Sequence, residues 1–295
     1  MASVIEQTEN TTLETASLLS FDEQEMLSKF SQVPFLIAHR LSDHPLFSVG
    51  SILELSKRLP EQCIEYNAGE LPISSEQIET PMTGLSIDET IRRIEECKSW
   101  MVLKYVEQDP AFRDVLETCL EELKPYTEQI APGMSCPQAF VFLTSPGSVT
   151  PYHIDPEHNF LLQIHGWKEI HQYDGRLKSI LSEEDLEHFY ADKGRNLQYD
   201  EAYEQNSWTF RLNAGLGLHF PVTYPHYVQN GDEVSISFSI TFRTPDLDRR
   251  QALYKYNSKR RDQGGTPPAV GSKPMRDEML YQYYRVMRKL GRQTW

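Results

Sequence analysis

The chain lacks closely spaced cysteines. Its 295 residues include four cysteines, and none of them forms the Cys-x-x-Cys spacing that zinc knuckles and redox motifs use. Isolated cysteines of this kind are typical of a reduced cytosolic protein in which most of the thiols are buried. We therefore expect reduced thiols and a cytoplasmic protein. The four residues are Cys63, Cys97, Cys119 and Cys136.

The sequence also lacks a long apolar run and early basic residues. Its longest apolar stretches, such as residues 35–38, are far shorter than the roughly 20 residues that a membrane-spanning helix needs. The first basic residue is Lys29, and the first twenty residues are rich in Thr and Glu. We therefore expect neither a membrane span nor an ordinary signal or transit peptide.

Positive charge is scarce over most of the chain, which has a net charge of −14. This balance argues against binding of nucleic acid through the whole surface. Residues 246–295 are the exception, because they hold 12 Lys and Arg residues against 5 Asp and Glu residues. A basic segment beside an acidic body can be self-complementary or can meet an acidic partner. The simpler interpretation is a solvated helical face, and we favour it.

The sequence predicts three helices from the residues at their N-termini. Ser86 and Glu89 have the spacing of a capping box, and Asp109 followed by Pro110 forms a good N-cap and first-turn pair. Residues 277 and 278 open a last helix, one side of which either docks on the body of the protein or pairs with a second copy. That side carries Met279, Tyr283, Val286 and Leu290. A homodimer through this helix is therefore one prediction.

Short strands dominate residues 137–243. Two turns, His165-Gly166-Trp167 and Asn230-Gly231, predict β-hairpins between their flanking strands, and Asn-Gly is the stronger of the two signals. Short antiparallel strands joined by tight turns favour a barrel or a sandwich. The predicted strands cover residues 139–144, 159–164, 168–173, 207–212, 216–222, 224–229 and 232–243.

A candidate metal site comes from His153, Asp155 and His226. Residues i and i+2 of a strand point the same way, so His153 and Asp155 project together while Ile154 turns into packing. Two imidazoles and one carboxylate can hold one face of a non-haem iron and leave its other positions open. Alone, an H-x-D tripeptide is also consistent with a surface turn.

The sequence around this tripeptide is more specific. In Thr150–Lys168, the elements T-P-x-H-x-D, N-F, Q-I-x-G and the final Lys occur together, and Gly217–His226 leads to the second histidine. Both stretches resemble the Jumonji-type (JmjC), cupin-like 2-oxoglutarate oxygenases, particularly the asparaginyl-hydroxylase branch. The resemblance covers roughly residues 34–245.

The resemblance implies a mainly β fold, namely a double-stranded β-helix of the jelly-roll or cupin type with flanking helices. From the residue pattern we also expect N-terminal α/β elements and a C-terminal helical extension. The expected division is an N-terminal tail and helix (1–30), an oxygenase domain with a helical insert (31–245) and a basic helical extension (246–295).

The resemblance also assigns roles to individual residues. His153, Asp155 and His226 match the iron ligands, while Lys168 and Thr150 match the residues that bind the distal carboxylate of 2-oxoglutarate. Asn159 and Ser239 fall where the family often places Asn near this cosubstrate, and Ser239 departs from that pattern. The residues before the second histidine also differ from the family. Where the family commonly has an aromatic pair, this chain has Thr223-Tyr224-Pro225, which alters the wall beside the iron.

Other residues leave alternatives open. Arg243 is a rival partner for 2-oxoglutarate, and we rank it below Lys168. The strand 234–242 alternates apolar residues with Ser235, Ser237, Ser239 and Thr241, whose polar face lines either solvent or a cavity, and we favour the cavity. His219 is expected to be packed, whereas His158, His165 and His171 are expected on the surface or in turns. Tyr152, Trp167 and Tyr224 either shape the substrate wall or pack.

The leading hypothesis is an Fe(II)- and 2-oxoglutarate-dependent oxygenase that uses O2, hydroxylates a C–H bond and releases succinate and CO2. The expected substrate is a peptide or protein side chain, or an amino-acid-like molecule, with no direct nucleic-acid partner. The alternatives are a JmjC-type N-demethylase, a non-catalytic cupin-like binding module, and a zinc or manganese cupin isomerase or hydrolase. The dicarboxylate-binding lysine argues against the last of these.

Overall fold

The computed structural model describes residues 17–74 and 82–291. Most of the N-terminal tail predicted for residues 1–30 therefore lies outside the described residues. The α-helices are α1 (Glu23–Lys29), α2 (Val49–Arg58), α3 (Ile87–Arg92), α4 (Pro110–Ile130), α5 (Glu183–Tyr190), α6 (Pro245–Asp262) and α7 (Pro274–Lys289). The short 3-10 helices are η1 (Pro45–Phe47), η2 (Glu61–Cys63), η3 (Val106–Gln108) and η4 (Glu201–Asn206).

The strands are β1 (Leu19–Ser20), β2 (Phe35–His39), β3 (Ile64–Ala68), β4 (Ser99–Lys104), β5 (Ser135–Thr144), β6 (Val149–His153), β7 (His158–His165), β8 (Trp167–Tyr173), β9 (Ser207–Asn213), β10 (Leu216–Phe220), β11 (His226–Asn230) and β12 (Ser235–Arg243). Two of the predicted helix starts are confirmed. Ser86 and Glu89 form the capping box of α3, and the Asp109 side chain caps α4.

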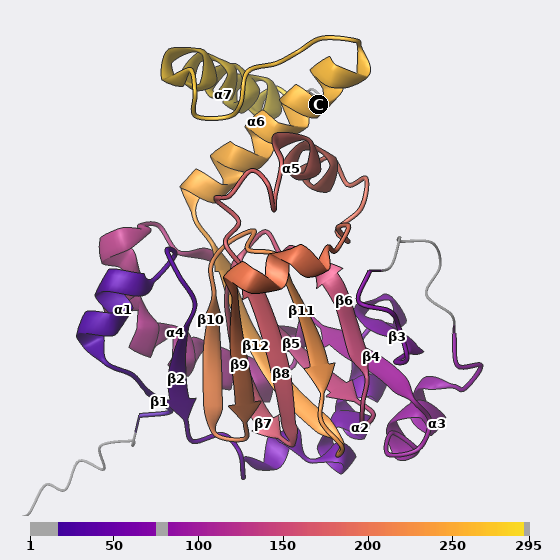
Figure 1. The fold of residues 1–295 in the computed structure, drawn as a ribbon. Coiled ribbons are helices and arrows are strands. Elements are labelled where there is room, and N and C mark those ends of the chain that lie inside the picture. The colour runs from indigo at the N-terminus through magenta and orange to yellow at the C-terminus, as the bar shows by residue number, and fades with distance from the viewer. Residues whose placement is uncertain (1–16, 75–81, 292–295) are drawn as a thin grey trace, which may run out of the picture.

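The strands form two antiparallel sheets that face each other (Figure 1). The larger sheet has the order β1-β2-β10-β7-β12-β5-β4-β3, and the smaller sheet has the order β6-β11-β8-β9. From β5 to β12, consecutive strands mostly change sheet, which is the winding of a jelly roll. The predicted double-stranded β-helix with flanking helices is therefore confirmed.

Both predicted hairpins are wrong. β7 pairs with β10 and β12, whereas β8 pairs with β9 and β11, so the turn at Gly166 crosses from one sheet to the other. Likewise β11 pairs with β6 and β8 but β12 pairs with β5 and β7, so Asn230-Gly231 is also a crossing. Turn residues indicate that the chain changes direction sharply, but they do not specify which strand the next strand pairs with.

The two faces of β12 separate the main core from the interior of the barrel. Ile236, Phe238, Ile240 and Phe242 are buried against helices on the outer face, where Phe238 contacts the ring of Phe112 from α4. The alternate residues are buried on the inner face, with exposed fractions of 3% or less. The solvated interpretation of this polar face is therefore wrong, and the cavity interpretation is confirmed for Ser239 and Thr241, which line a cavity, whereas Ser235 and Ser237 hydrogen-bond to Gln163. Its residues are Ser235, Ser237, Ser239 and Thr241.

A carboxylate holds the outer face of the smaller sheet together. Glu204 of η4 accepts hydrogen bonds from the hydroxyls of Tyr173 (2.6 Å), Tyr199 (2.6 Å) and Tyr227 (3.1 Å). The His171 ring nitrogen lies 3.2 Å from the other carboxylate oxygen. Burial acts to raise the pKa of Glu204, but the hydrogen bonds outweigh it and lower the pKa to about 2.

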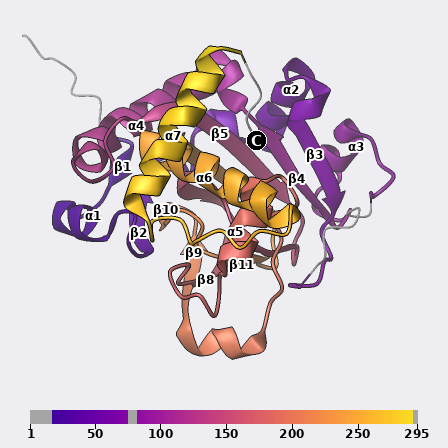
Figure 2. The ribbon, with the colours of Figure 1, turned by 90° about the horizontal axis from the view of Figure 1, so that it is seen from above.

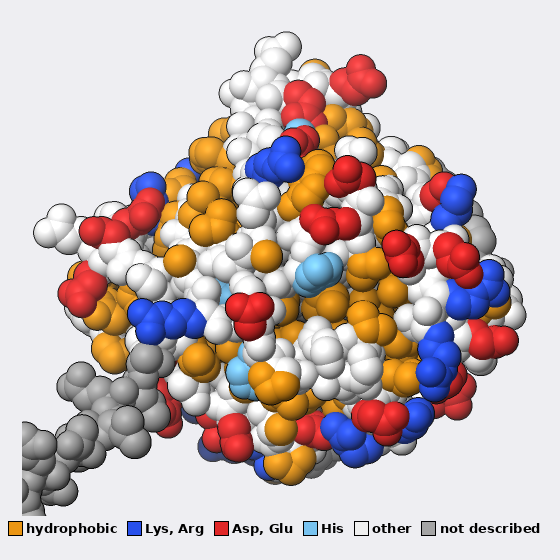
Figure 3. Space-filling view, turned by 90° about the horizontal axis from the view of Figure 1, so that it is seen from below, with side chains coloured by type: hydrophobic (Ala, Val, Ile, Leu, Met, Phe, Trp, Pro, Cys, Tyr) orange, Lys and Arg blue, Asp and Glu red, His pale blue; other side chains and the backbone are white. Residues whose placement is uncertain are grey.

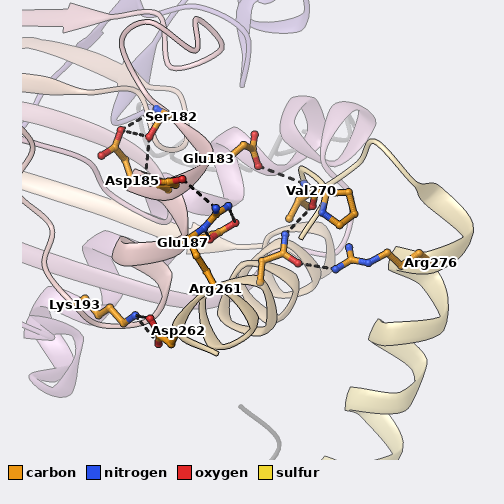
Figure 4. Close-up of polar contacts among 12 residues, drawn as sticks. Ser182, Glu183, Asp185, Glu187, Lys193, Arg261, Asp262, Val270 and Arg276 are labelled. Carbon is orange, nitrogen blue, oxygen red and sulfur yellow. Dashed lines mark hydrogen bonds and ion pairs between the residues drawn. The ribbon is translucent and has the colours of Figure 1, made fainter. Parts of the chain in front are cut away.

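Helices α5 and α6 lie over one end of the sheets, and α7 crosses α6 (Figures 1 and 2). The close-up in Figure 4 shows the polar contacts that fix them. Arg261 of α6 pairs with the buried Glu187 of α5 at 2.6 Å, and Lys193 pairs with Asp262 at 2.7 Å. Beneath them, Ile154 is fully buried in an apolar cluster with residues of α5 and α6. The predicted packing of Ile154 is confirmed, and it connects the C-terminal helices to the chain between His153 and Asp155.

The apolar side of α7 does not dock on the body of the protein. Met279, Tyr283, Val286 and Leu290 are all at least half exposed. The structure thus contradicts one of the two interpretations of this helix. The opposite end of the molecule, seen from below in Figure 3, shows acidic and basic side chains interspersed around its edge.

The remaining predictions about composition have mixed outcomes. All four cysteines are free, but Cys136 is exposed and Cys97 only half-buried, so the expectation of mostly buried thiols holds for two of them. Among the described residues, no helix is both long and apolar enough to cross a membrane. The cytoplasmic location and the division at residues 30 and 245 stay predictions.

Glu204 gives a test of the fold. Because its pKa is lowered on folding, its contribution to stability is present above about pH 4.5 and is lost as the pH falls towards about 2. We expect Glu204→Gln to reduce the free energy of unfolding at pH 7 by about 2 kcal/mol, since neutral hydrogen bonds replace charge-assisted ones. Urea unfolding at pH 7 and pH 3 measures this effect, which should shrink at the lower pH. Glu201→Gln, an exposed neighbour, is the control, and an equal loss in both variants would contradict this role.

Candidate metal centre

Strand pairing brings the three predicted ligands together. β6 and β11 are antiparallel neighbours, and their register sets His153 directly opposite His226. Asp155 follows two residues after the end of β6. One ligand atom from each of the three side chains lies within 4.8 Å of the other two. The rings of the two histidines are 4.2 Å apart between centroids.

Backbone carbonyls select the metal-binding nitrogen of each histidine. The His153 Nδ1 lies 2.6 Å from the carbonyl oxygen of Pro151, and the His226 Nδ1 lies 2.9 Å from that of Tyr224. An Nδ1–H that donates to a carbonyl leaves Nε2 with its lone pair free for a metal. Burial lowers the pKa of both imidazoles, so both are neutral at neutral pH.

Asp155 is fixed by an arginine and by the opposite chain segment. Arg195 Nη2 donates to Asp155 Oδ1 at 3.0 Å, while Asp155 Oδ2 lies 3.8 Å from His153 Nε2 and 3.6 Å from His226 Nε2. The Thr223 N–H donates to the backbone oxygen of Asp155 at 2.9 Å. Burial raises the pKa of Asp155, but Arg195 and the two imidazoles outweigh it and lower the pKa to about 2.

These donors fit a divalent transition metal. Two neutral imidazoles and one ionised carboxylate on one side form the facial set that suits ferrous iron, whereas calcium and magnesium prefer oxygen donors alone. Phe220 packs edge-on against the His226 ring at 4.8 Å between centroids, which restricts the ring's movement and excludes water on that side.

A cavity of about 260 Å³ adjoins the triad, and Lys168 lines it. The Lys168 side chain is only 4% exposed, and none of the described residues pairs with its ammonium group. Burial lowers the pKa of Lys168 to about 7. A buried ammonium without a counter-ion is unfavourable, so an anion bound in the cavity would stabilise its charged form.

The other predicted cosubstrate residues lie in the same cavity. Thr150, Asn159 and Ser239 all line it. The Ser239 hydroxyl donates to Asn159 Oδ1 at 2.7 Å, and Trp100 Nε1 donates to Thr150 Oγ1 at 3.1 Å. Their roles towards a cosubstrate stay predictions.

The rival Arg243 is occupied elsewhere. Its side chain bonds to Asp248 at 2.9 Å and to Gln251 at 2.8 Å at the start of α6, and its guanidinium lies 3.9 Å from Glu157. Arg243 is not among the residues that line the cavity beside the triad. This placement agrees with ranking Arg243 below Lys168.

The structure corrects the placement of several histidines. His219 is buried between aromatic rings, as expected for a packed residue. His158 is also buried, although a surface position was predicted, because it stacks on Phe30 and Phe242. His171 stacks on Tyr227 and is mostly buried, whereas His165 is exposed.

The three aromatic residues proposed for the substrate wall do not line the metal cavity. Tyr152 is buried among tyrosines on the outer side of the smaller sheet, because it alternates with His153 along β6. Trp167 stacks under the guanidinium of Arg211. Tyr224 lines a different cavity.

Several cavity residues were missed in the sequence. Arg195 lies in a loop between α5 and η4 with no periodic pattern, so nothing in the sequence placed it near Asp155. Glu157 was overlooked although it is two residues from Asp155; burial, and then the charge of Asp155, raise its pKa to about 7. Trp100 of β4 also lines the cavity, and no pattern in its strand indicates that this face meets the cavity. Aromatic residues that line it are Trp100, Tyr105, Phe140, Phe142 and Phe220.

Comparison with known proteins agrees with the fold and the ligand set. The JmjC domain family matches residues 117–249, a range that contains all three ligands and Lys168. The JmjC domain-containing protein D of Dictyostelium discoideum is 33% identical over 114 residues. That match covers 34% of this chain and 23% of the Dictyostelium protein, so it spans less than a quarter of the relative's length.

Solved structures with the same fold include YcfD from Escherichia coli. One YcfD structure matches with a TM-score of 0.53 at 14% identity, over 91% of this chain and 68% of that one. A second, described as a ribosomal oxygenase, matches with a TM-score of 0.51 at 13% identity, over 91% and 67% of the two chains. The chain therefore shares its fold with these YcfD structures.

Removal of one ligand tests the metal centre. We expect His226→Ala to weaken Mn(II) binding at least about 100-fold, since even outer contacts to metal ligands change affinity 10- to 100-fold. Titration with Mn(II) followed by electron paramagnetic resonance measures the free ion. His165→Ala, which removes an exposed histidine, should bind like the unmodified protein. Equal affinities for the two variants would exclude His226 as a ligand.

Proposed function

We propose that this protein is an Fe(II)- and 2-oxoglutarate-dependent oxygenase. The observation that carries the proposal is the buried Lys168 ammonium, which shares one cavity with His153, Asp155 and His226. The triad offers a site for ferrous iron, and Lys168 offers a cation for the distal carboxylate of 2-oxoglutarate. Lysine acts at such sites as a point charge.

Similar proteins support this assignment. A structure of YcfD from Escherichia coli, described as a ribosomal oxygenase in complex with cobalt and 2-oxoglutarate, matches with a TM-score of 0.50 at 14% identity, over 91% of this chain and 67% of that one. Cobalt and 2-oxoglutarate are ligands of that protein. Here the same ligand classes are inferred from the donor set and the unpaired lysine.

Each residue has a positioning role in this proposal. Iron, 2-oxoglutarate and O2 supply the oxidation of a C–H bond, and the protein supplies placement and electrostatics. His153 and His226 present Nε2, while Arg195 holds one oxygen of Asp155 and leaves the other directed at the histidines. Lys168 fixes the far end of 2-oxoglutarate, so that its keto acid end turns towards the triad.

The polar face of β12 completes the cosubstrate pocket. Ser239 and Asn159 hydrogen-bond to each other, and Thr150 lies across from them on β6. Hydroxyl and amide groups at these positions can donate to carboxylate oxygens without adding charge. We infer that they orient 2-oxoglutarate, in agreement with the resemblance in this part of the chain.

The substrate is inferred to be a polypeptide side chain that becomes hydroxylated. The cavity contains a row of aromatic residues and extends to Tyr105, which is 39% exposed. The charged pair of Lys104 and Glu65 lies beside it. This lining fits a side chain entering from the surface. Demethylation of an N-methyl group begins with the same C–H oxidation, and detection of a mass gain of one oxygen, rather than a loss of one methylene, distinguishes the two.

A non-catalytic binding module and a zinc or manganese cupin enzyme are the remaining alternatives. Neither requires a buried, unpaired lysine beside the triad, because neither binds a dicarboxylate there. Conversion of 2-oxoglutarate to succinate separates the oxygenase from both.

Asp155→Ala tests the proposed activity. Even without its substrate, the iron-loaded protein is expected to convert 2-oxoglutarate slowly to succinate, and the variant should lose at least about 100-fold in rate because a ligand is missing. Succinate is measured by mass spectrometry, and circular dichroism checks the fold. Asp114→Ala, at an exposed position of α4, is the matched control. Unchanged succinate formation in Asp155→Ala would refute the assignment of the triad.

We also propose that α7 pairs with a second copy of the chain. Its exposed apolar side, including Met279 at 73% and Leu290 at 64% exposure, is typical of an interaction surface. Met279→Lys should shift the mass measured by light scattering from dimer to monomer. Arg288→Gln, on the other side of the helix, should leave the mass unchanged. A monomeric unmodified protein at about 100 μM, where even micromolar association would be visible, would contradict the proposal.

A further inference from the structure

A second cavity lies next to the metal cavity, and its volume of about 750 Å³ is larger. Its walls come from α5, α6, the segment before β11 and the chain around residues 31 and 130. The polar and charged residues that line it include His158, Arg176, Lys178, Thr244 and Arg250. None of them was assigned to the metal centre.

The two cavities share their dividing walls. Glu157 lines the metal cavity, and its neighbour His158 lines the second one. In the same way, Phe220 lines the first cavity and Val222 the second. Neighbouring Cα atoms are about 3.8 Å apart, and an extended chain advances about 3.3 Å per residue. At these points a single layer of backbone therefore separates the two cavities.

Positive charge lines the second cavity, although the protein as a whole is acidic. Arg176, Lys178 and Arg250 border it, and only Asp246 brings a carboxylate into its lining. The three cationic side chains are between 56% and 58% exposed, and their present partners are Asp174, Glu183 and Asp246. The Arg176–Asp174 pair is bidentate, and Asp174 and Glu183 are only 16% and 21% exposed. The Arg250–Asp246 pair is exposed on both sides, and such pairs are weak, so an incoming anion can compete for Arg250.

The start of α6 brings free backbone amides to the cavity, together with Asp246 and Asp248 in its first turn. Thr244 is the N-cap of α6, but its side chain makes no capping hydrogen bond. Thr244, Pro245, Asp246 and Leu247 all line the cavity. The first amide groups of an α-helix have no acceptor within the helix, and the helix dipole favours an anion there.

His158 is a buried polar group in the wall of this cavity. Its side chain is 2% exposed, and its Nδ1 has no hydrogen-bond partner among the described residues. Burial, and then the charges of Arg250 and Arg243, lower the pKa of His158 to about 4. The ring is therefore neutral at pH 7 and keeps one N–H that can donate to an oxygen.

We propose that the second cavity binds a carboxylate group of the polypeptide substrate while the reacting side chain occupies the metal cavity. This inference rests on the proposed oxygenase function for the identity of the polypeptide as substrate. The binding itself requires neither metal nor 2-oxoglutarate. A carboxylate matches the planar guanidinium of Arg250 in shape and charge.

Such a carboxylate has two sources, an acidic side chain or the C-terminus of the substrate. Three small probes distinguish them: N-acetylglutamate N-methylamide, N-acetylalanine and the neutral N-acetylglutamine N-methylamide. Saturation-transfer NMR with the metal-free, full-length protein detects binding in the millimolar range. We expect at least one carboxylate probe to bind about tenfold more tightly than the neutral probe, and to be weakened by 0.5 M NaCl.

Substitutions in the second cavity test whether the carboxylate probe binds there. Lys178→Gln combined with Arg250→Gln should weaken the carboxylate probe about tenfold. The control combines Lys57→Gln with Arg92→Gln, two exposed and ion-paired cations on α2 and α3, and should have no effect.

Two outcomes would overturn the inference: equal binding of the neutral probe, or equal binding by both double variants. A protein that forms no succinate but still binds the probe would refute the oxygenase function without refuting the carboxylate site.

Discussion

The antiparallel register of β11 with its two neighbours is the constraint on which the site depends. On one side, this register sets His226 opposite His153; on the other side, it sets Asn230 opposite Lys168. The two ends of the strand are roughly 13 Å apart along its axis. A slip by one residue would turn these side chains to the outer face, where Tyr227 now lies. One strand therefore fixes both the metal ligands and the buried cation.

The segment around Asp155 is held from two directions. From the barrel, Thr223 donates to its backbone; from the α5–η4 loop, Arg195 bonds to its carboxylate. Ile154 adds apolar contact with α5 and α6, so the C-terminal helices contribute to the metal centre although they lie outside the barrel. The ion pairs of Figure 4 hold those helices in place and thereby support the ligands indirectly. The same helices form part of the second cavity.

The residues of the metal centre can be predicted from the sequence better than the pairing of the strands that hold them. The i, i+2 spacing of His153 and Asp155 has a direct geometric meaning in a strand, and the polar alternation of β12 predicted its buried inner face. The turns at Gly166 and Asn230-Gly231 were misread as hairpins, because local turn preferences do not encode which sheet the next strand joins. Arg195 could not be predicted, since its position depends on how a long insertion folds back.

The most direct measurement is the number of protons taken up when 2-oxoglutarate binds to the Mn(II)-loaded protein. The pKa of Lys168 is lowered to about 7 by burial, so at pH 8.5 this lysine is mostly neutral until a carboxylate pairs with it. Calorimetry in buffers of different ionisation enthalpy should therefore show uptake of nearly one proton per ligand at pH 8.5. Uptake should disappear in Lys168→Met. Binding without proton uptake, or the same uptake in the variant, would contradict the account.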